Sequence, residues 1–361
     1  MKKIALLTFH RAYNYGARLQ AYALFRKLEL WGHDCLIVRY ETPSQMAQYK
    51  IFQPDFSLIG ILRNVRNILN YYANKKRKVC FDDFSDTNCR YTDIVTNKIQ
   101  LQRLLNQYDV VLVGSDQTWN IKEKAFDDVY FLPFDIKGKK VSYASSAGDD
   151  VKTWSDEEKL RIANNLRGFE SLSIRENSGK EMLRQNGIDA VQVVDPTLLL
   201  TKYDWENVQS CNIVHDEKYI LYYSVKSTDF SVQFVKHFSS ITGLKVIAIH
   251  PQNSFELNSG FIRKIEMGPD GFIEYISKAK YVVTTSFHAT VFSLIFNKMF
   301  FCPTKNDRII DLLQKVNLLD RVVTSNDDSF LLEKEIDWRS VASKLDVLRN
   351  ESENYLKMAL R

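Results

Sequence analysis

The sequence predicts an α/β protein made of two successive doubly wound domains. Short apolar runs that suit buried strands alternate with helical patterns in residues 1–200, and the alternation restarts beyond Leu200. The length of 361 residues also exceeds the usual size of a single core. We therefore expect Rossmann-like domains at residues 1–200 and 215–335, facing each other across a cleft. Residues 336–361 are expected to form a C-terminal helix that packs across both domains.

The first half supplies most of the predicted strands. They are expected at residues 4–9, 35–38, 108–114, 141–145, 171–174 and 191–194. A helix is predicted over residues 17–31 because Leu19, Tyr22 and other apolar residues recur at helical spacing before Gly32. Ser155 and Glu158 form a capping box, in which each side chain serves the other's backbone N–H, so another helix should begin there.

The second half repeats the alternation. Strands are expected at residues 219–225, 245–249, 281–285 and 299–302, with helices at 229–241, 271–279 and 309–316. Gly243 suits the left-handed cap at the end of the first of these helices. The tail carries Trp338, Val341, Leu345, Leu348 and Tyr355 at helical spacing, a stripe that favours packing over binding.

Composition excludes several classes of protein. The net charge of +5 is too small to indicate a nucleic-acid partner, and the five cysteines are scattered without the C-x-x-C spacing of a zinc or redox site. No nucleotide, zinc-protease or hydrolase motif occurs, and nothing has metal-ligand spacing, so no metal or cofactor is predicted. The N-terminus is expected to be a strand and not a signal peptide, which favours a cytoplasmic protein.

Two strand-to-helix junctions are the most informative features. In an open α/β sheet, ligands bind beyond the carboxyl ends of strands, where free N–H groups and the positive helix end favour anions. One such junction carries Thr285, Ser286 and His288. A histidine at a helix start is often only a cap or a packing residue, but its hydroxyl neighbours favour a proton donor aimed at an anionic substrate.

The other junction follows the first strand and contains Asn14, Tyr15 and Gly16. Either Asn14 or Gly16 takes positive φ in a simple turn, or the loop approaches a ligand. A second strand exit of the same half carries Ser115 and Asp116. Asp116 either caps the following turn or serves as a general base for a hydroxyl acceptor.

Arg175 ends a predicted strand next to Glu176. The two residues either form an ordinary surface ion pair, which stabilises little, or Arg175 faces the cleft and binds a phosphate or carboxylate through its forked guanidinium.

The stretch from residue 56 to residue 81 has six basic residues and no acidic one. The basic residues are Arg63, Arg66, Lys75, Lys76, Arg77 and Lys78, and seven apolar residues between Leu58 and Tyr72 recur at helical spacing. Two interpretations are equally supported. The segment 58–78 is either a surface helix with a solvated polar face, or a helix that lies in the plane of a membrane and contacts anionic lipid head groups.

Six motifs together resemble the polysaccharide pyruvyl transferase family. They begin at Asn14 (NYGARLQAYAL), Val113 (VGSDQTWN), Tyr143 (YASSAG), Ser173 (SIRE), Val194 (VDPTLL) and Thr285 (TSFHATVFS). The resemblance runs from the first strand to about Val316. It implies a fold similar to B-type glycosyltransferases and transfer of enolpyruvate from phosphoenolpyruvate to a sugar, as a ketal. The sugar would be part of a nascent surface polysaccharide or a lipid-linked oligosaccharide.

The resemblance also implies roles for particular residues. His288 would be the catalytic acid or would hold the leaving phosphate, and Arg175 would bind the carboxylate or phosphate. The anion pocket would be completed by Thr285, Ser286, Lys305 and Arg308. The sugar would face Asn14, Tyr15, Gly16, Ser115 and Asp116 of the first domain. Many family members carry arginine where this chain has Ser286, so the resemblance implies that another cation takes that place.

Two other functions stay open at this point. The expected architecture also suits a glycosyltransferase that uses a nucleotide sugar, and Ser286 in place of arginine would suit a non-catalytic scaffold that binds glycans. For the transferase, the basic segment 58–78 predicts peripheral contact at the inner face of the membrane, beside a lipid-linked acceptor.

Overall fold

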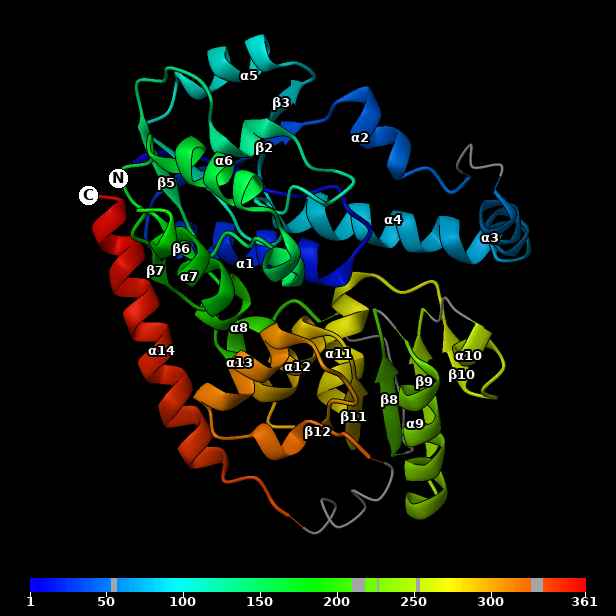
Figure 1. Cartoon of the computed structure of the whole chain (residues 1–361). Coiled ribbons are helices and arrows are strands. Elements are labelled where there is room, and N and C mark those ends of the chain that lie inside the picture. Colours follow the sequence, from blue (N-terminus) through cyan, green and yellow to red (C-terminus); the bar gives the residue numbers. More distant parts are fainter. Residues whose placement is uncertain (53–56, 210–217, 226, 251–253, 326–333) are drawn as a thin grey trace. The chain divides into compact units, whose positions relative to one another are not determined.

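The computed structural model describes residues 1–52, 57–209, 218–225, 227–250, 254–325 and 334–361. Contacts divide the chain into two compact units (Figure 1). Unit 1 comprises residues 1–69, 85–200 and 347–361, and unit 2 comprises residues 70–84 and 201–346. Residue 215, where the sequence predicts that the second domain begins, lies outside the described residues.

Unit 1 contains a parallel five-stranded sheet in the order β3-β2-β1-β4-β5. Its strands are β1 (Lys3–Leu7), β2 (Asp34–Tyr40), β3 (Tyr91–Val95), β4 (Val110–Val113) and β5 (Lys139–Ser142). A parallel pair, β6 (Ser173–Ile174) and β7 (Val191–Gln192), continues beyond β5 through isolated bridges such as Ser145 to Ile174. Strands that run parallel bring all their carboxyl ends to one edge, which is where a site is expected.

Alternating side chains of the unit 1 strands enter two different cores. Ile4 and Leu6 pack into one cluster, and Ala5 and Leu7 pack into the other. Such strands have no polar face because helices cover both sides of the sheet, as in doubly wound folds generally.

The helices of unit 1 connect consecutive strands. They are α1 (Tyr15–Leu30), α2 (Pro43–Gln48), α3 (Leu58–Leu69), α5 (Lys98–Leu105), α6 (Asp156–Leu166) and α7 (Asn177–Gln185). The capping box of Ser155 and Glu158 is present at the start of α6, as predicted. Gly187 follows α7 with φ of +74°, which an L side chain rarely adopts.

Unit 2 repeats the architecture, with a parallel sheet in the order β10-β9-β8-β11-β12. Its strands are β8 (Tyr219–Tyr223), β9 (Lys245–Ile249), β10 (Ile262–Lys264), β11 (Tyr281–Thr284) and β12 (Met299–Phe301). Its helices are α8 (Lys202–Glu206), α9 (Asp229–Thr242), α10 (Ser254–Leu257), α11 (Pro269–Lys278), α12 (Phe287–Ile295) and α13 (Asp307–Lys315). The predicted α/β class with two Rossmann-like sheets is therefore confirmed.

Two helices have residues in both units. Helix α4 (Tyr71–Asn88) lies in unit 2 up to Phe84, and α14 (Trp338–Ala359) lies in unit 1 from Val347 onward. In α14, Tyr355 of the predicted stripe packs against a core of unit 1 that contains Leu356, and its hydroxyl donates a hydrogen bond to the Ser142 carbonyl at 2.9 Å. Among the described residues, no helix combines the length and apolar character that crossing a membrane requires.

Candidate functional site

Both sheets have a topological switch point, where the strand order changes direction. In unit 1 the chain moves outward from β1 to β3 and then returns to place β4 on the other side of β1. In unit 2 the same change occurs between β8 and β11. Neighbouring loops leave such a pair of strands in opposite directions, which opens a crevice that favours ligand binding. All the site residues predicted from the sequence follow strands of these two sheets or their continuation.

Gln20 joins the two loops at the switch point of unit 1. Its side chain donates to the Thr8 hydroxyl at 3.0 Å and accepts from the Ser115 backbone N–H at 3.1 Å. Ser115 is fully buried, and its hydroxyl donates to the Ala144 carbonyl at 3.0 Å. The Ser115 side chain therefore anchors the loop after β4 to the loop after β5.

The next residue, Asp116, has a backbone φ of 59°. This left-handed conformation is uncommon for a residue other than glycine, although aspartate tolerates it better than most. The Asp116 carbonyl accepts from the N–H groups of Thr118 at 2.8 Å and Ser146 at 2.9 Å. Gly114 permits the turn, because a Cβ there would lie 2.0 Å from the Tyr143 carbonyl oxygen. The loop thus fixes the direction of a carboxylate that remains partly exposed.

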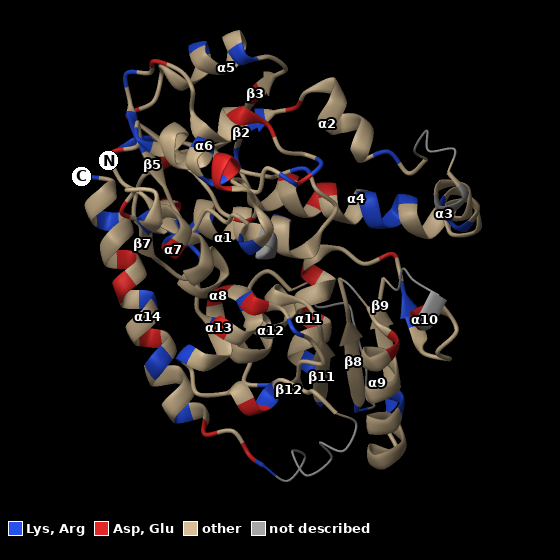
Figure 2. Ribbon diagram, viewed as in Figure 1, with Lys and Arg blue, Asp and Glu red and all other residues tan. Residues whose placement is uncertain are grey.

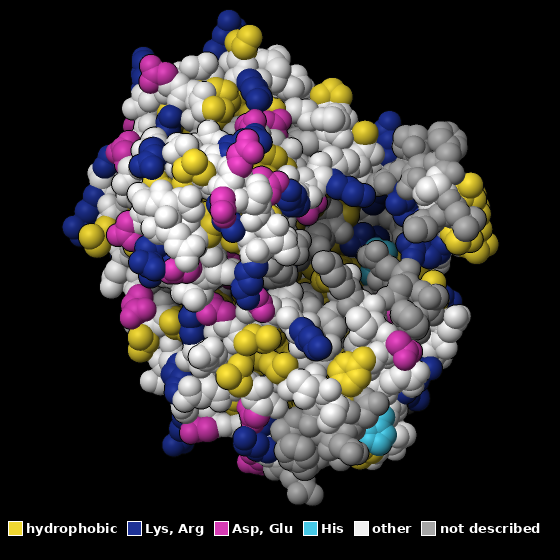
Figure 3. Space-filling model, in the orientation of Figure 1, with side chains coloured by type: hydrophobic (Ala, Val, Ile, Leu, Met, Phe, Trp, Pro, Cys, Tyr) yellow, Lys and Arg dark blue, Asp and Glu magenta, His cyan; other side chains and the backbone are white. Residues whose placement is uncertain are grey.

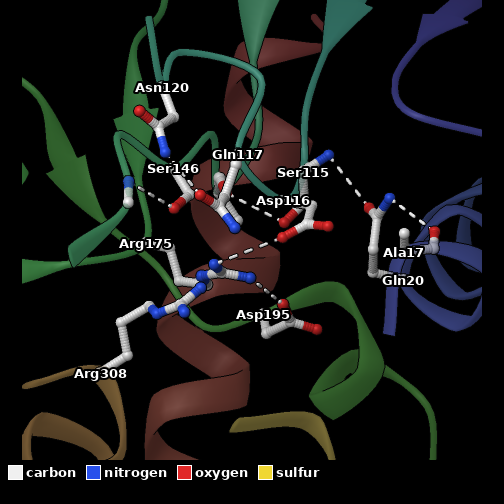
Figure 4. Close-up of polar contacts among 12 residues, drawn as sticks. Ala17, Gln20, Ser115, Asp116, Gln117, Asn120, Ser146, Arg175, Asp195 and Arg308 are labelled. Atoms are coloured by element: carbon white, nitrogen blue, oxygen red, sulfur yellow. Dashed lines mark hydrogen bonds and ion pairs between the residues drawn. The ribbon is translucent and has the colours of Figure 1, made fainter. Parts of the chain in front are cut away.

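Arg175 directly follows β6 and contacts three carboxylates, two of which, Asp116 and Asp195, are labelled beside it in Figure 4. Its Nε lies 2.9 Å from Glu176, its Nη1 lies 2.8 Å from Asp195, and its Nη2 lies 3.7 Å from Asp116. The side chains of Arg175, Glu176 and Asp195 are almost completely buried. The interpretation of Arg175 and Glu176 as a surface ion pair is therefore wrong.

Electrostatics explain how the buried arginine keeps its charge. Burial alone lowers the pKa of Arg175, but Glu176, Asp195 and Asp116 oppose that effect and raise the pKa above its usual value. With all groups ionised, the four side chains carry a formal charge of about −2. This cluster favours hydroxyl donors over a second anion. The contact between Asp195 and Arg175 was not predicted from the sequence.

The loop after β1 starts α1. Asn14 has φ of −121° and its side chain accepts from the Ala17 N–H, so it is the N-cap of the helix. Neither Asn14 nor Gly16 has the positive φ of a simple turn. Asn14 is exposed, whereas Tyr15 is fully buried and Gly16 is buried. Of the three, only Asn14 presents its side chain to solvent.

His288 lies in the first turn of α12, which begins directly after β11 at the switch point of unit 2. The N-cap is Ser286, whose hydroxyl accepts from the Ala289 N–H at 3.5 Å. The His288 side chain is largely buried, and its ring lies 5.4 Å from the Phe287 ring. The helix start therefore presents an imidazole together with the positive end of the helix.

Hydroxyl groups line the same edge of the unit 2 sheet. Thr285 and Ser224 follow the adjacent strands β11 and β8, and their hydroxyl oxygens are 2.7 Å apart. The Thr284 hydroxyl donates to the Tyr223 carbonyl and accepts from the Ser286 N–H at 3.0 Å. These contacts fix the chain at the point where α12 begins.

Lys305 and Arg308 follow β12, which is the neighbour of β11 on the side away from β8. Lys305 is exposed and Arg308 is half-buried, and between them Asn306 caps α13. In unit 2, therefore, the loops that follow β11 and β12 carry His288, Lys305, Arg308 and the starts of α12 and α13. In unit 1, the corresponding edge carries the carboxylate cluster.

A second cluster at the edge of unit 1 was not predicted from the sequence. His10 and Glu41 follow β1 and β2 and line a slot of about 10 Å³, which is room for about one water molecule. His10 is buried, its Nδ1 lies 3.3 Å from the Thr8 carbonyl, and its Nε2 lies 3.6 Å from Glu41. Arg39 and Arg11 contact the same Glu41 oxygen at 3.0 and 3.5 Å. The signal in the sequence was a titratable residue within three positions of the end of each of two adjacent strands.

His10 and Glu41 both make the folded protein less stable as the pH falls. Contact with His10 lowers the pKa of Glu41 to about 2, against burial and with help from Arg39 and Arg11. A carboxyl group whose pKa falls on folding stabilises the fold above its unfolded pKa of about 4.5, and this stabilisation is lost as the pH falls toward 2. Burial lowers the pKa of His10 below 6.5, so its protonation on unfolding favours the unfolded state below that pH.

We therefore expect Glu41→Gln to lower the free energy of unfolding by about 1–3 kcal/mol near neutral pH. The difference from wild type should shrink as the pH falls from about 4.5 toward 2, as measured by urea unfolding at a series of pH values. Glu181→Gln is the control, because Glu181 pairs with Arg184 at 2.7 Å but is exposed and should contribute little. Equal effects of the two substitutions at neutral pH would contradict this account.

Among the described residues, no group of three or more His, Cys, Asp or Glu side chains could hold a metal ion. The carboxylates of Asp116, Glu176 and Asp195 instead contact Arg175.

Solved structures with a similar fold cover almost the whole chain. UDP-N-acetylglucosamine 2-epimerase from Rickettsia bellii is 11% identical with a TM-score of 0.58, covering 100% of this chain and 97% of its own. The UDP-GlcNAc 2-epimerase of Methanocaldococcus jannaschii, in complex with UDP-GlcNAc and UDP, is 14% identical with a TM-score of 0.54 and coverages of 96% and 93%. Anabaena Alr3699/HepE in complex with UDP is 11% identical with a TM-score of 0.52 and coverages of 99% and 97%. These likenesses show the fold, which is the two-domain type of the B-type glycosyltransferases.

No curated protein matches the chain. The family model described as polysaccharide pyruvyl transferase matches residues 14–302, which is most of its length. The matched region contains the Asn14 loop, Asp116, Arg175 and His288. The chain therefore belongs to the polysaccharide pyruvyl transferase family.

Proposed function

We propose that the protein transfers enolpyruvate from phosphoenolpyruvate to a pair of sugar hydroxyls and forms a ketal during the synthesis of a surface polysaccharide. Membership of the family supports a transferase acting on a polysaccharide. The observation that carries the proposal is the position of His288 in the first turn of α12, at the switch point of unit 2. An acid at an anion-binding helix start suits a substrate that is both anionic and activated by protonation.

Unit 2 would bind the donor. Phosphoenolpyruvate carries a phosphate and a carboxylate, and Lys305 and Arg308 provide positive charge at the edge that also carries the starts of α12 and α13. Thr285 and Ser286 would add hydroxyl and N–H donors close to His288. In this proposal Lys305 or Arg308 supplies the cation that many family members have at position 286.

The reaction then follows from the chemistry of the enol. Protonated His288 gives its proton to the methylene carbon, which becomes a methyl group, and the positive charge develops on the neighbouring carbon. One sugar hydroxyl adds to that carbon and loses its proton. The C–O bond to phosphate then breaks, the second hydroxyl adds and loses its proton, and the cyclic ketal closes. The leaving phosphate takes up one of the protons released.

Unit 1 would bind the acceptor. Asp116 is the proposed general base, because its carboxylate is partly exposed and its direction is fixed by the loop. We propose that Arg175 acts through Asp116, because its guanidinium already contacts three carboxylates. Asn14 would contact the sugar, and Tyr15, Gly16 and Ser115 would hold the two loops in position. The acceptor proposed is a lipid-linked or nascent glycan.

Thermal shift with small anions tests the choice of donor. Phosphoenolpyruvate and, more weakly, phosphate should raise the melting temperature, because a ligand at ~100 times its Kd stabilises the folded state by about 2.7 kcal/mol. Lys305→Ala combined with Arg308→Ala should reduce this shift. The matched control is Lys280→Ala, because Lys280 is exposed and directly precedes β11, at the amino-terminal edge of the same sheet.

The same screen separates the competing functions. A nucleotide-sugar glycosyltransferase would be protected by UDP or UDP-sugars and not by phosphoenolpyruvate. A non-catalytic glycan-binding scaffold would be protected by neither. Either pattern would overturn the proposed donor, as would an equal loss of the shift in the Lys280 control.

A further inference from the structure

Helix α3 has an unusual exposed face. Five aliphatic side chains at helical spacing lie on its surface, and Figure 3 shows apolar side chains gathered over this element. Their exposed fractions are 49% for Ile61, 61% for Leu62, 48% for Val65, 62% for Ile68 and 80% for Leu69. Single exposed apolar residues are common, but five along one helix form a contiguous patch, which marks an interaction site.

The opposite face of α3 is the polar one. Gly60 is buried, and Arg63, Asn64 and Asn67 are half-buried. The Asn67 side chain donates to the Ile51 carbonyl at 2.6 Å. A surface helix of a globular protein places its apolar stripe inward and its polar residues toward solvent. The polarity of α3 is reversed, so this part of the segment 58–78 is not a surface helix with a solvated polar face. Residues 71–78 belong to a separate helix, α4.

The charge of the surrounding sequence favours one type of partner. Residues 56–81 contain six basic residues and no acidic one, and Lys75 and Lys76 on the following helix α4 are exposed. Figure 2 shows Lys and Arg on α4. A second copy of this chain seated on α3 would bring two such basic segments together, with like charges opposed. A surface of anionic lipid is complementary both to the basic residues and to the apolar patch.

The length of α3 fits contact with the membrane surface. At 12 residues it is well short of the roughly 20 needed to cross a bilayer. A short helix with an apolar face and basic residues lies in the plane of the interface, with that face in the head-group and acyl boundary.

We propose that α3 docks the protein on an anionic bilayer by inserting the face formed by Ile61, Leu62, Val65, Ile68 and Leu69. The inference deepens the proposed function, because docking would bring the enzyme to an acceptor carried on a lipid at the inner face of the membrane. The purpose of docking rests on the proposed function, whereas binding to the bilayer can be tested independently of it.

Vesicle sedimentation of the full chain tests the proposal. Wild type should sediment with vesicles that contain phosphatidylglycerol and much less with pure phosphatidylcholine, and rising salt should weaken the binding. Leu62→Glu combined with Ile68→Glu should lower binding at least roughly tenfold. Lys75→Gln combined with Lys76→Gln should lower it by about tenfold or more at low salt and by less at high salt.

The matched control is Ile99→Glu combined with Leu160→Glu, which replaces two exposed aliphatic residues of unit 1 outside α3 and should bind as wild type does. Equal binding of wild type to both vesicle types, no binding, or unchanged binding of the α3 variant would overturn the proposal. A dimer in solution that the α3 variant converts to a monomer would also overturn it, because a second copy would then cover this face. Phosphoenolpyruvate binding should be unchanged in the α3 variant, which separates failure of docking from failure of the proposed function.

Discussion

Replacing His288 with asparagine is expected to lower kcat for ketal formation by about 10²–10⁴-fold, which is the usual contribution of a positioned general acid. Asparagine keeps a polar side chain of similar reach in the first turn of α12, but its amide can only donate hydrogen bonds and cannot act as an acid. Because the imidazole is proposed to act on the methylene carbon, the transition state should lose more stabilisation than the bound donor. The expected result is a large fall in kcat with a smaller change in the KM for phosphoenolpyruvate.

Phosphate release and ketal formation are measured with a panel of glycosides that carry hydroxyl pairs on neighbouring carbons or on carbons separated by one other. The control is His237→Asn, because His237 is exposed on α9 in the same unit. Its kcat should match that of wild type. A His288→Asn variant that is folded and retains kcat within about twofold would exclude an acid role, since a positioned acid contributes at least ~10²-fold.

Replacing Arg175 with methionine is expected to lower the free energy of unfolding by about 3–5 kcal/mol. Glu176 and Asp195 are almost completely buried, and the substitution removes the cation that their carboxylates contact at 2.9 and 2.8 Å. Removing one partner of a buried ionic group leaves uncompensated charge in a poorly solvated place, which costs more than the net value of the intact group.

Urea unfolding of variants separates this cause from a simple loss of packing. Adding Glu176→Gln and Asp195→Asn to Arg175→Met should recover part of the lost stability, because the repelling charges disappear. Arg184→Met is the control, since the Arg184 and Glu181 pair is exposed and should contribute little to stability. An equal loss of stability in the two single variants would contradict the buried-charge account. Arg175→Lys should keep more stability than Arg175→Met and still lower kcat, because Asp116 loses its partner of fixed direction.

Sequence patterns predicted the fold well where the elements are apolar and regular. The strand predicted at residues 281–285 is present as β11, and α12 follows it, because a buried apolar run identifies a central strand. The N-cap role of Ser286 was not predicted. Strand β3 and strand β10 were not predicted. Each lies at the edge of its sheet with exposed positions, so neither has the apolar run that identifies a central strand.

The candidate site was only partly predictable. The sequence placed Asp116 and His288 at strand exits because that is a local property of the chain. It could not predict that Asp195 contacts Arg175, since this contact joins residues twenty positions apart through the fold. The direction of the apolar face of α3 was equally hidden, because periodicity shows that a face exists and not whether it points to the core or to solvent.

The most direct test of the account is the rate of solvent deuterium transfer to the donor. In deuterated water, wild-type enzyme should form a ketal whose methyl group contains one solvent deuterium, and His288→Asn should slow that transfer by the same 10²–10⁴-fold factor as kcat. Transfer at the wild-type rate in the His288→Asn variant, or a product whose methylene carbon gains no solvent hydrogen, would contradict the proposal that His288 protonates phosphoenolpyruvate.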